Sequence, residues 1–333
     1  MSIECMHPAV EAPTGAPTAR ARLGRTDPAR LTGSVTAATS LFLIGSAAPV
    51  AATLEVPLLA GQGFRYIVAT AALMIILAFA GRLSRAVPRP RDLGRIGLLG
   101  AFGVAGFTSA FVLATRYADP ALVGSVLAAT PVVLAVVGPL LRRQRPAIGV
   151  IIGALTVTAG TAIATGAGSS TPPGIGLCLI ALGSEVAFTV FAMPLIDRYG
   201  TLSTTLYAAV SGAVLLSVAG MIIDGPTSMI TAGTRTSDLP ALLYLGLAVS
   251  VGANLAWYAA LPRLGPDRAG LFYAFSPIGA LSAGLVLGTS SPTAGEVVGL
   301  AVVLIGLLVG LRARTRDQRP TTVGRGASGQ GPT

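Results

Sequence analysis

Lysine is absent from this sequence of 333 residues, so all twenty-three basic residues are Arg. A phosphate-binding loop of the type G-x-x-x-x-G-K-[ST] requires Lys, which argues against direct use of ATP. Histidine occurs once, as His7 in a polar N-terminal segment, and the two cysteines, Cys5 and Cys178, match no metal or redox spacing. We therefore expect no metal site, no cofactor and no histidine-based catalysis.

Charged residues of both signs are also scarce. They make up 11% of the chain, whereas a soluble domain carries about 25%. Hydrophobic residues make up 53%, and the mean hydropathy is +0.76. Because so few charges cannot cover a soluble surface, the composition predicts an all-α polytopic membrane protein.

Ten apolar stretches approach the roughly 20 residues that a helix needs to cross a bilayer. They run over about 34–54, 62–81, 94–115, 120–141, 147–166, 174–195, 203–223, 240–261, 268–289 and 294–312. They are continuously apolar rather than alternating, which excludes a membrane barrel of strands. Residues 1–30 and 313–333 are polar, and we expect them to form disordered cytoplasmic tails.

The arginines support ten crossings. When the connections are assigned to two faces in turn, twenty Arg fall on one face and only Arg116 and Arg235 on the other, while Arg65 lies inside a stretch. Since basic residues are retained on the cytoplasmic side, we predict a bacterial plasma-membrane protein with both termini in the cytoplasm. The net charge of +10 then lies in loops, so no nucleic-acid partner is expected.

The sequence repeats itself at a shift of 146 positions, which places residues 98–163 on 244–309. Six glycines and three prolines coincide, where chance gives about one glycine match. The pairs are Gly100 and Gly246, Gly106 and Gly252, Gly124 and Gly270, Gly149 and Gly295, Gly153 and Gly299, Gly160 and Gly306, Pro120 and Pro266, Pro131 and Pro277, and Pro146 and Pro292. We expect two five-helix repeats, 31–166 and 174–312.

Five crossings per repeat is an odd number, so the second copy must enter the membrane from the opposite face. Such inverted repeats are common in secondary transporters, which place the substrate between the copies near the membrane midplane. The arrangement therefore favours a transporter.

Three segments resemble a known family. They are GFRYIVATAALMIILAFAG (63–81), RYADPALVGSVLAATPVVLAVVGPLL (116–141) and LGPDRAGLFYAFSPIGALSAGLVLG (264–288). With the ten-span layout, they resemble EamA-type members of the drug/metabolite transporter superfamily over about residues 31–312. The resemblance implies export of small molecules such as amino acids or drugs, without specifying one. Members often carry an acidic residue after the fourth and ninth spans, where this sequence reads LLRRQRP and LGTSSP.

Two ionisable residues lie within the stretches. Glu185 is halfway along the sixth, where a charge is expensive unless it meets a cavity or a partner. We interpret it as a contact for a substrate ammonium group or as a proton site; the alternative is packing against Ser46 or Ser184. Arg65, one turn inside the second stretch, is a candidate for guiding an anionic group or gating the outer mouth. Its alternative is a guanidinium that reaches the membrane interface.

The remaining candidates are aromatic and small polar residues. Thr108 and Phe111 coincide with Asn254 and Trp257 under the shift of 146. The candidate substrate-binding set is completed by Tyr258, Tyr273, Thr130 and Ser276. Aromatic walls with a few polar groups are typical of a small-molecule cavity, and ordinary helix packing is the alternative.

Pro131 and Pro277 lie near the middle of the fourth and ninth stretches, where proline removes a backbone hydrogen bond. They are candidate hinges, or static bends that help packing. The small-residue pairs Gly149/Gly153 and Gly295/Gly299 favour close helix packing within the bundle, with a dimer interface as the alternative. The protein is accordingly expected to be a monomer or a homodimer.

Three classes of function remain. The first is a secondary transporter that exports a small metabolite such as an amino acid, by alternating access, with protons as a candidate coupling ion. The second is an intramembrane enzyme acting on a lipid-linked substrate, and the third is a membrane scaffold or sensor subunit. We favour the transporter and expect no enzyme, because the acidic residues are scattered over the span ends and neither tail resembles a signalling domain.

Overall fold

The computed structural model describes residues 28–82, 87–118, 120–166, 171–289 and 293–313. Over these residues the fold is all-helical, without a β-strand element. Eight helical segments are long and apolar enough to cross a membrane, so the chain is a multi-pass membrane protein. The two predicted tails lie outside the described residues, apart from residues 28–30, which begin the first helix, and Ala313, which follows the last one.

The first part of the chain is a series of helical elements. They are α1 (Pro28–Ala51), α2 (Leu58–Phe79), the 3-10 turn η3 (Pro90–Asp92), α3 (Leu93–Leu98), the π-helix η4 (Leu99–Gly106), α4 (Phe107–Tyr117), α5 (Pro120–Leu127), α6 (Thr130–Leu141) and α7 (Ile148–Thr165). The run from η3 to α4 has no break between its elements. By contrast, α5 and α6 are separated at residues 128 and 129, directly before Pro131.

The second part begins with a long helix. Its elements are α8 (Pro172–Ile223), α9 (Ser228–Thr234), α10 (Leu239–Tyr244), the π-helix η5 (Leu245–Ala253), α11 (Asn254–Leu264), α12 (Pro266–Leu271), the 3-10 turn η6 (Phe272–Phe275), α13 (Ser276–Val286) and α14 (Ala294–Arg312). As a straight helix, α8 would be roughly 78 Å long, more than twice the thickness of a bilayer core. The helix instead turns at Gly200, whose φ of 78° is readily adopted only by glycine.

Local sequence signals explain where several helices start. The Thr171 side chain accepts a hydrogen bond from the Gly174 backbone N–H at the start of α8. At the start of α14, Thr293 and Glu296 form a reciprocal capping box. Pro131 and Pro277 occupy the first turns of α6 and α13. In a first turn, the N–H group that proline lacks would have no hydrogen-bond partner within the helix. Pro131 therefore begins a helix after the gap at residues 128 and 129, whereas Pro277 lies where the 3-10 turn η6 passes directly into α13.

Element boundaries in the two parts correspond at the shift of 146. The π-helices begin at residues 99 and 245, α6 and α13 begin at 130 and 276, and α7 and α14 begin at 148 and 294. Because π-helices are rare, their recurrence at corresponding positions is a strong sign that one backbone design occurs twice.

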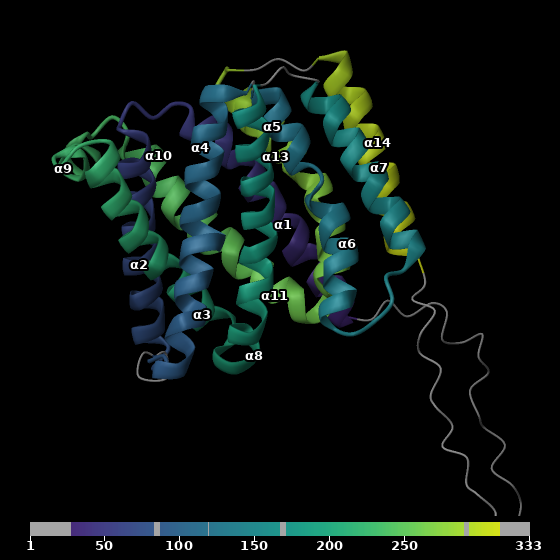
Figure 1. Ribbon diagram of the computed structural model, residues 1–333, viewed down its shortest axis with the longest axis horizontal. Coiled ribbons are helices and arrows are strands. Elements are labelled where there is room, and N and C mark those ends of the chain that lie inside the picture. Colours follow the sequence, from purple (N-terminus) through teal and green to yellow (C-terminus); the bar gives the residue numbers. More distant parts are fainter. Residues whose placement is uncertain (1–27, 83–86, 119, 167–170, 290–292, 314–333) are drawn as a thin grey trace, which may run out of the picture.

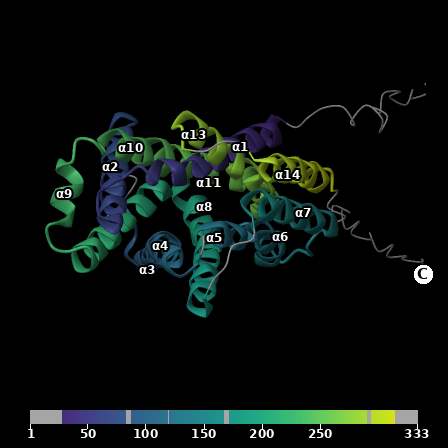
Figure 2. The same cartoon turned by 90° about the horizontal axis from the view of Figure 1, so that it is seen from above.

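Helices α7 and α14 approach each other along their glycines. A β-carbon added to Gly153 would lie 2.5 Å from the Cα of Gly310, and one added to Gly160 would lie 2.6 Å from the backbone nitrogen of Val303. The two helices run side by side at one end of the bundle, with α2 and α9 at the other end (Figures 1 and 2). The predicted small-residue packing is therefore used within the chain.

Candidate functional site

Glu185 of α8 is hydrogen-bonded to a phenol on another helical rod. The hydroxyl of Tyr273, in η6, donates to Glu185 Oε1. The predicted packing partner Ser46 instead shares a hydrogen bond of 2.7 Å with the Tyr244 hydroxyl. In the part of the chain that the structure describes, Glu185 makes no ion pair. Its carboxyl group thus has a neutral partner and no compensating protein cation.

Trp257 of α11 extends this pair into a network. Its ring meets the ring of Tyr273 edge-on, with centroids 6.0 Å apart and planes at 85°. Its indole Nε1 donates to Thr189 Oγ1 at 3.1 Å. Because Thr189 lies one helical turn after Glu185, α8 presents two polar side chains to this aromatic pair. Thr189 is not among the residues predicted from the sequence, although its i, i+4 spacing from Glu185 is a usable signal.

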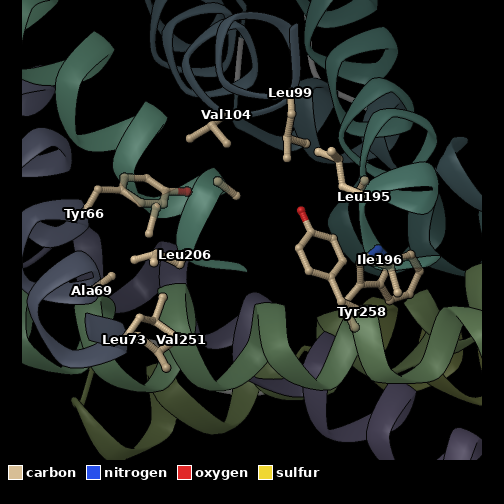
Figure 3. Packing of buried hydrophobic residues seen from close by; sticks show 14 of the residues in the cluster. Tyr66, Ala69, Leu73, Leu99, Val104, Leu195, Ile196, Leu206, Val251 and Tyr258 are labelled. Carbon is tan, nitrogen blue, oxygen red and sulfur yellow. The ribbon is translucent and has the colours of Figure 1, made fainter. Parts of the chain in front are cut away.

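Tyr258 follows Trp257 and has a hydroxyl group without a partner. The residue is fully buried, and its ring stacks on Phe188 with centroids 5.2 Å apart. Among the described residues its hydroxyl finds no hydrogen-bond partner, and such a buried orphan costs about 1–3 kcal/mol. Figure 3 shows that the Tyr258 hydroxyl and the Tyr66 hydroxyl both point toward the middle of the largest buried cluster. A hydrogen-bond acceptor bound there would satisfy the orphan donor.

The π-helices precede two of the predicted residues. Asn254 begins α11 directly after η5, and its side-chain amide donates to the Ser250 carbonyl at 3.0 Å. Thr108 is the second residue of α4 after η4 and is buried. Both residues therefore follow a local widening of the helix, a feature that often occurs at functional sites.

Phe111 lies apart from Trp257, its counterpart at the shift of 146. It stacks on Phe107, with centroids 5.8 Å apart, and packs against the cluster that contains Val123 and Cys178. Trp257 belongs to the large central cluster. The shift of 146 relates the two residues without bringing them together.

Thr130 and Ser276 are the first residues of α6 and α13. The Thr130 hydroxyl donates to the Leu127 carbonyl at 2.6 Å, across the gap between α5 and α6. A β-carbon added to Gly45 would overlap the Ser276 carbonyl oxygen, so α1 and α13 touch through their backbones. Thr130 therefore lies at the gap between α5 and α6, and Ser276 lies at the contact between α1 and α13. Neither residue forms part of the Glu185 network.

Arg65 lies over an aromatic ring. Its guanidinium carbon is 4.8 Å from the ring centroid of Tyr66, and its Nη2 donates to the Tyr66 hydroxyl at 3.3 Å. Its buried Nε has no hydrogen-bond partner. Arg65 makes no ion pair with Glu185 within the described residues, so one cation and one carboxyl group remain separate.

A groove of about 320 Å³ lies against α8 and η4, and none of its lining residues belongs to the Glu185 network. It is lined by Phe102, Ile180, Gly183, Ser184, Ala187 and Phe191. The lining is almost entirely apolar, and the volume is at the lower end of small-molecule sites. No cluster of three or more His, Cys, Asp or Glu that could hold a metal occurs within the described residues.

An aromatic wall, one carboxyl group and one orphan hydroxyl suit the recognition of a small molecule with a cationic or hydrogen-bonding group. The EamA-like transporter family model matches residues 31–166 and 172–312. The chain belongs to the EamA-like transporter family. A member of this family is a membrane-embedded transporter of small molecules, which favours transport over the enzyme and scaffold alternatives.

Relatives of known sequence agree with this assignment. The chain is 22% identical to an uncharacterized transporter of Archaeoglobus fulgidus, over 75% of this chain and 87% of the relative. It is 26% identical to a protein of Streptantibioticus cattleyicolor named a probable terminal-alkyne amino-acid exporter, over 78% of this chain and 86% of the relative. A solved crystal structure superposes with a TM-score of 0.73 at 22% identity, covering 86% of this chain and 99% of that one, which supports the fold.

Proposed function

We propose that this EamA-like transporter exports a small metabolite, such as an amino acid, across the bacterial cell membrane by alternating access. The chain would cross the membrane ten times, with the two arms of α8 and the broken rod α5–α6 counted as three spans. Both termini would lie in the cytoplasm, and the five-helix repeats 31–166 and 174–312 would be inverted. The Arg distribution of twenty against two and the matching element boundaries support this layout.

The Glu185 network is the observation on which the substrate site rests. Its three elements are α8, α11 and η6, all from the second repeat, and it joins a carboxyl group to two aromatic rings without a protein cation. A substrate ammonium group fits such surroundings, because aromatic faces and a carboxylate both attract cations. A coupling proton on Glu185 fits the same geometry, since a neutral carboxyl group is stable in apolar surroundings.

The wider site would include the other residues whose types suit a small molecule. They are Arg65, Thr108, Phe111, Asn254, Trp257, Tyr258, Tyr273, Thr130 and Ser276, with Pro131 and Pro277 as hinges. Thr189 and Phe188 join this set because they contact Trp257 and Tyr258. The protein would act as a monomer or a homodimer.

The test is a comparison of exported metabolites between cells that lack the protein and cells that overproduce it. Each compound whose external concentration follows the protein is then offered to the purified protein in sealed vesicles. The proposal expects saturable flux of at least one amine-containing metabolite, and flux of none of these compounds would contradict it.

A further inference from the structure

Three buried aspartates join segments that lie far apart in the sequence. Asp92, in η3, is 2% exposed and accepts hydrogen bonds from Arg198 Nη1 at 2.8 and 2.9 Å and from the Tyr199 hydroxyl at 2.6 Å. Arg198 and Tyr199 directly precede the corner of α8 at Gly200. Asp92 therefore fixes the start of the run η3–α4 to the corner of α8. This corner lies on the Arg-rich face, the predicted cytoplasmic face to which twenty of the arginines are assigned.

Asp238 makes the equivalent contact in the other repeat. Its position is that of Asp92 plus 146, and it directly precedes α10. It is 4% exposed, and its Oδ2 accepts from the backbone N–H groups of Glu55 and Val56 at 3.1 and 3.0 Å. These residues form the corner between α1 and α2, on the Arg-poor face. Asp92 and Asp238 thus form related contacts at opposite faces of one structure.

Asp267 differs because its contact occurs on one face only. Asp267, in α12, is 5% exposed and pairs with Arg142, which follows α6. Moving this pair by 146 gives Ala121 and Gly288, and neither residue carries a charge. An ion pair of this kind therefore has no counterpart on the Arg-poor face.

The segments around Arg142 and Asp267 are also closely packed. A β-carbon added to Gly138 would lie 2.8 Å from Pro266 Cγ, and one added to Gly265 would lie 2.5 Å from the Arg142 guanidinium. At the other ends of the same two rods, α5 and α13 lie on opposite sides of α11 in the view from above (Figure 2). The rods α5–α6 and α12–α13 therefore meet at the Arg-rich face and diverge at the other.

Alternating access requires that a gate be closed on one face while its counterpart is open. Contacts made on both faces in a single state cannot be such gates, whereas a contact made on one face can. We infer that the Arg142–Asp267 pair is the latch of a cytoplasmic gate, and that the Asp92 and Asp238 contacts are fixed pivots that persist throughout the cycle. This inference rests on the proposed function for its direction of opening.

The test uses a cysteine reporter beneath the latch. Leu134 of α6 is 1% exposed and faces Gly270 of α12, so it becomes accessible only when these rods separate. The reporter Leu134→Cys is placed in a background with Cys5→Ser and Cys178→Ala. A membrane-impermeant maleimide is then applied to inside-out vesicles, in which the cytoplasmic face is exposed.

Asp267→Asn should raise the labelling rate at least about tenfold, because a hydrogen bond to a charged group contributes enough to shift a two-state equilibrium by that factor. Arg142→Gln should act in the same direction. The exchange Arg142→Asp with Asp267→Arg should restore slow labelling. The matched controls Asp92→Asn and Asp238→Asn should leave the rate within about twofold of the reference, since these contacts do not open.

Unchanged labelling in both Asp267→Asn and Arg142→Gln would overturn the latch, and so would an equal acceleration in Asp92→Asn. A failure to fold would appear as a loss of monodisperse protein after extraction, in which case the charge exchange decides the result. Labelling needs no substrate. Latch behaviour in a protein without flux would therefore contradict the proposed transport and leave the latch supported.

Discussion

The segments 99–141 and 245–286 share a backbone and differ in their side chains. Each begins with a π-helix, continues into a regular helix and then breaks before a helix that starts at a proline. At the shift of 146, Trp257 occupies the place of Phe111, Tyr258 that of Val112, and Tyr273 that of Leu127. One segment presents indole and phenol groups where the other presents only hydrocarbon.

Under the proposed transport cycle, the shared backbone would support movement and the differing side chains would bind the substrate. Symmetry of the backbone is what a two-state rocking frame requires. Recognition requires hydrogen-bonding groups, and those that contact Glu185 and Thr189 come from the second segment. Substitutions in 245–286 should therefore impair transport more than substitutions at the corresponding places in 99–141.

The largest effect is expected from Glu185→Gln, which keeps the shape of the side chain and cannot ionise. Loss of a buried charged contact reduces binding by about a hundredfold or more, and we expect gradient-driven accumulation in vesicles to fall by that order. If the carboxyl group binds the coupling proton, exchange of substrate should survive; if it binds the ammonium group, exchange should fall as well. The matched control is Glu296→Gln, which preserves the capping box of α14. Normal accumulation in Glu185→Gln would remove Glu185 from the site.

A smaller effect is expected from Trp257→Phe, which removes the hydrogen bond to Thr189 and retains an aromatic ring. Loss of one neutral hydrogen bond corresponds to about a fivefold change, so flux at low substrate concentration should fall about fivefold. The change Phe111→Leu, at the corresponding place in the first segment, should alter flux less than about twofold. Equal losses in the two variants would show that the segments contribute equally.

The smallest effect on flux is expected from Tyr258→Phe. The same substitution should increase the stability of the fold. Removal of the orphan hydroxyl should raise the free energy of unfolding by about 1–3 kcal/mol, because this buried donor is then no longer left unpaired. If the hydroxyl serves the substrate, substrate affinity should fall by about threefold or more in the same variant. Thermal unfolding in detergent and KM in vesicles measure the two quantities. A stabilised variant with unchanged KM would make the hydroxyl a defect in packing only.

The helical class, and the element boundaries that correspond at the shift of 146, were predictable from sequence because glycine, proline and apolar runs report local backbone requirements. The matching of Pro131 with Pro277 predicted corresponding positions in the fourth and ninth stretches, and the structure places each proline in the first turn of a helix. The π-helices were not predicted, since neither LGAFGVAG nor LGLAVSVGA has a pattern that distinguishes a π-helix from an α-helix.

Side-chain partners were less predictable than the backbone. Glu185 was singled out as an intramembrane carboxyl group, but Ser46 and Ser184 were considered as its partners. Its observed partner, Tyr273, is 88 residues away. Such a contact depends on how α8 and η6 pack, which periodicity within one helix does not report. Tyr273 was nevertheless in the candidate set, because a phenol within an apolar span is itself a signal.

Cysteine labelling from the two faces tests the inverted arrangement most directly. Single cysteines are introduced at Ile230 in α9 and at Gln144 between α6 and α7, both exposed, in the background without native cysteines. The account predicts that a membrane-impermeant reagent added to intact cells modifies the cysteine at 230 and leaves the one at 144 unmodified, with the reverse in inside-out vesicles. Modification of position 144 from outside intact cells would contradict the ten-span layout, and with it the account of two opposed repeats.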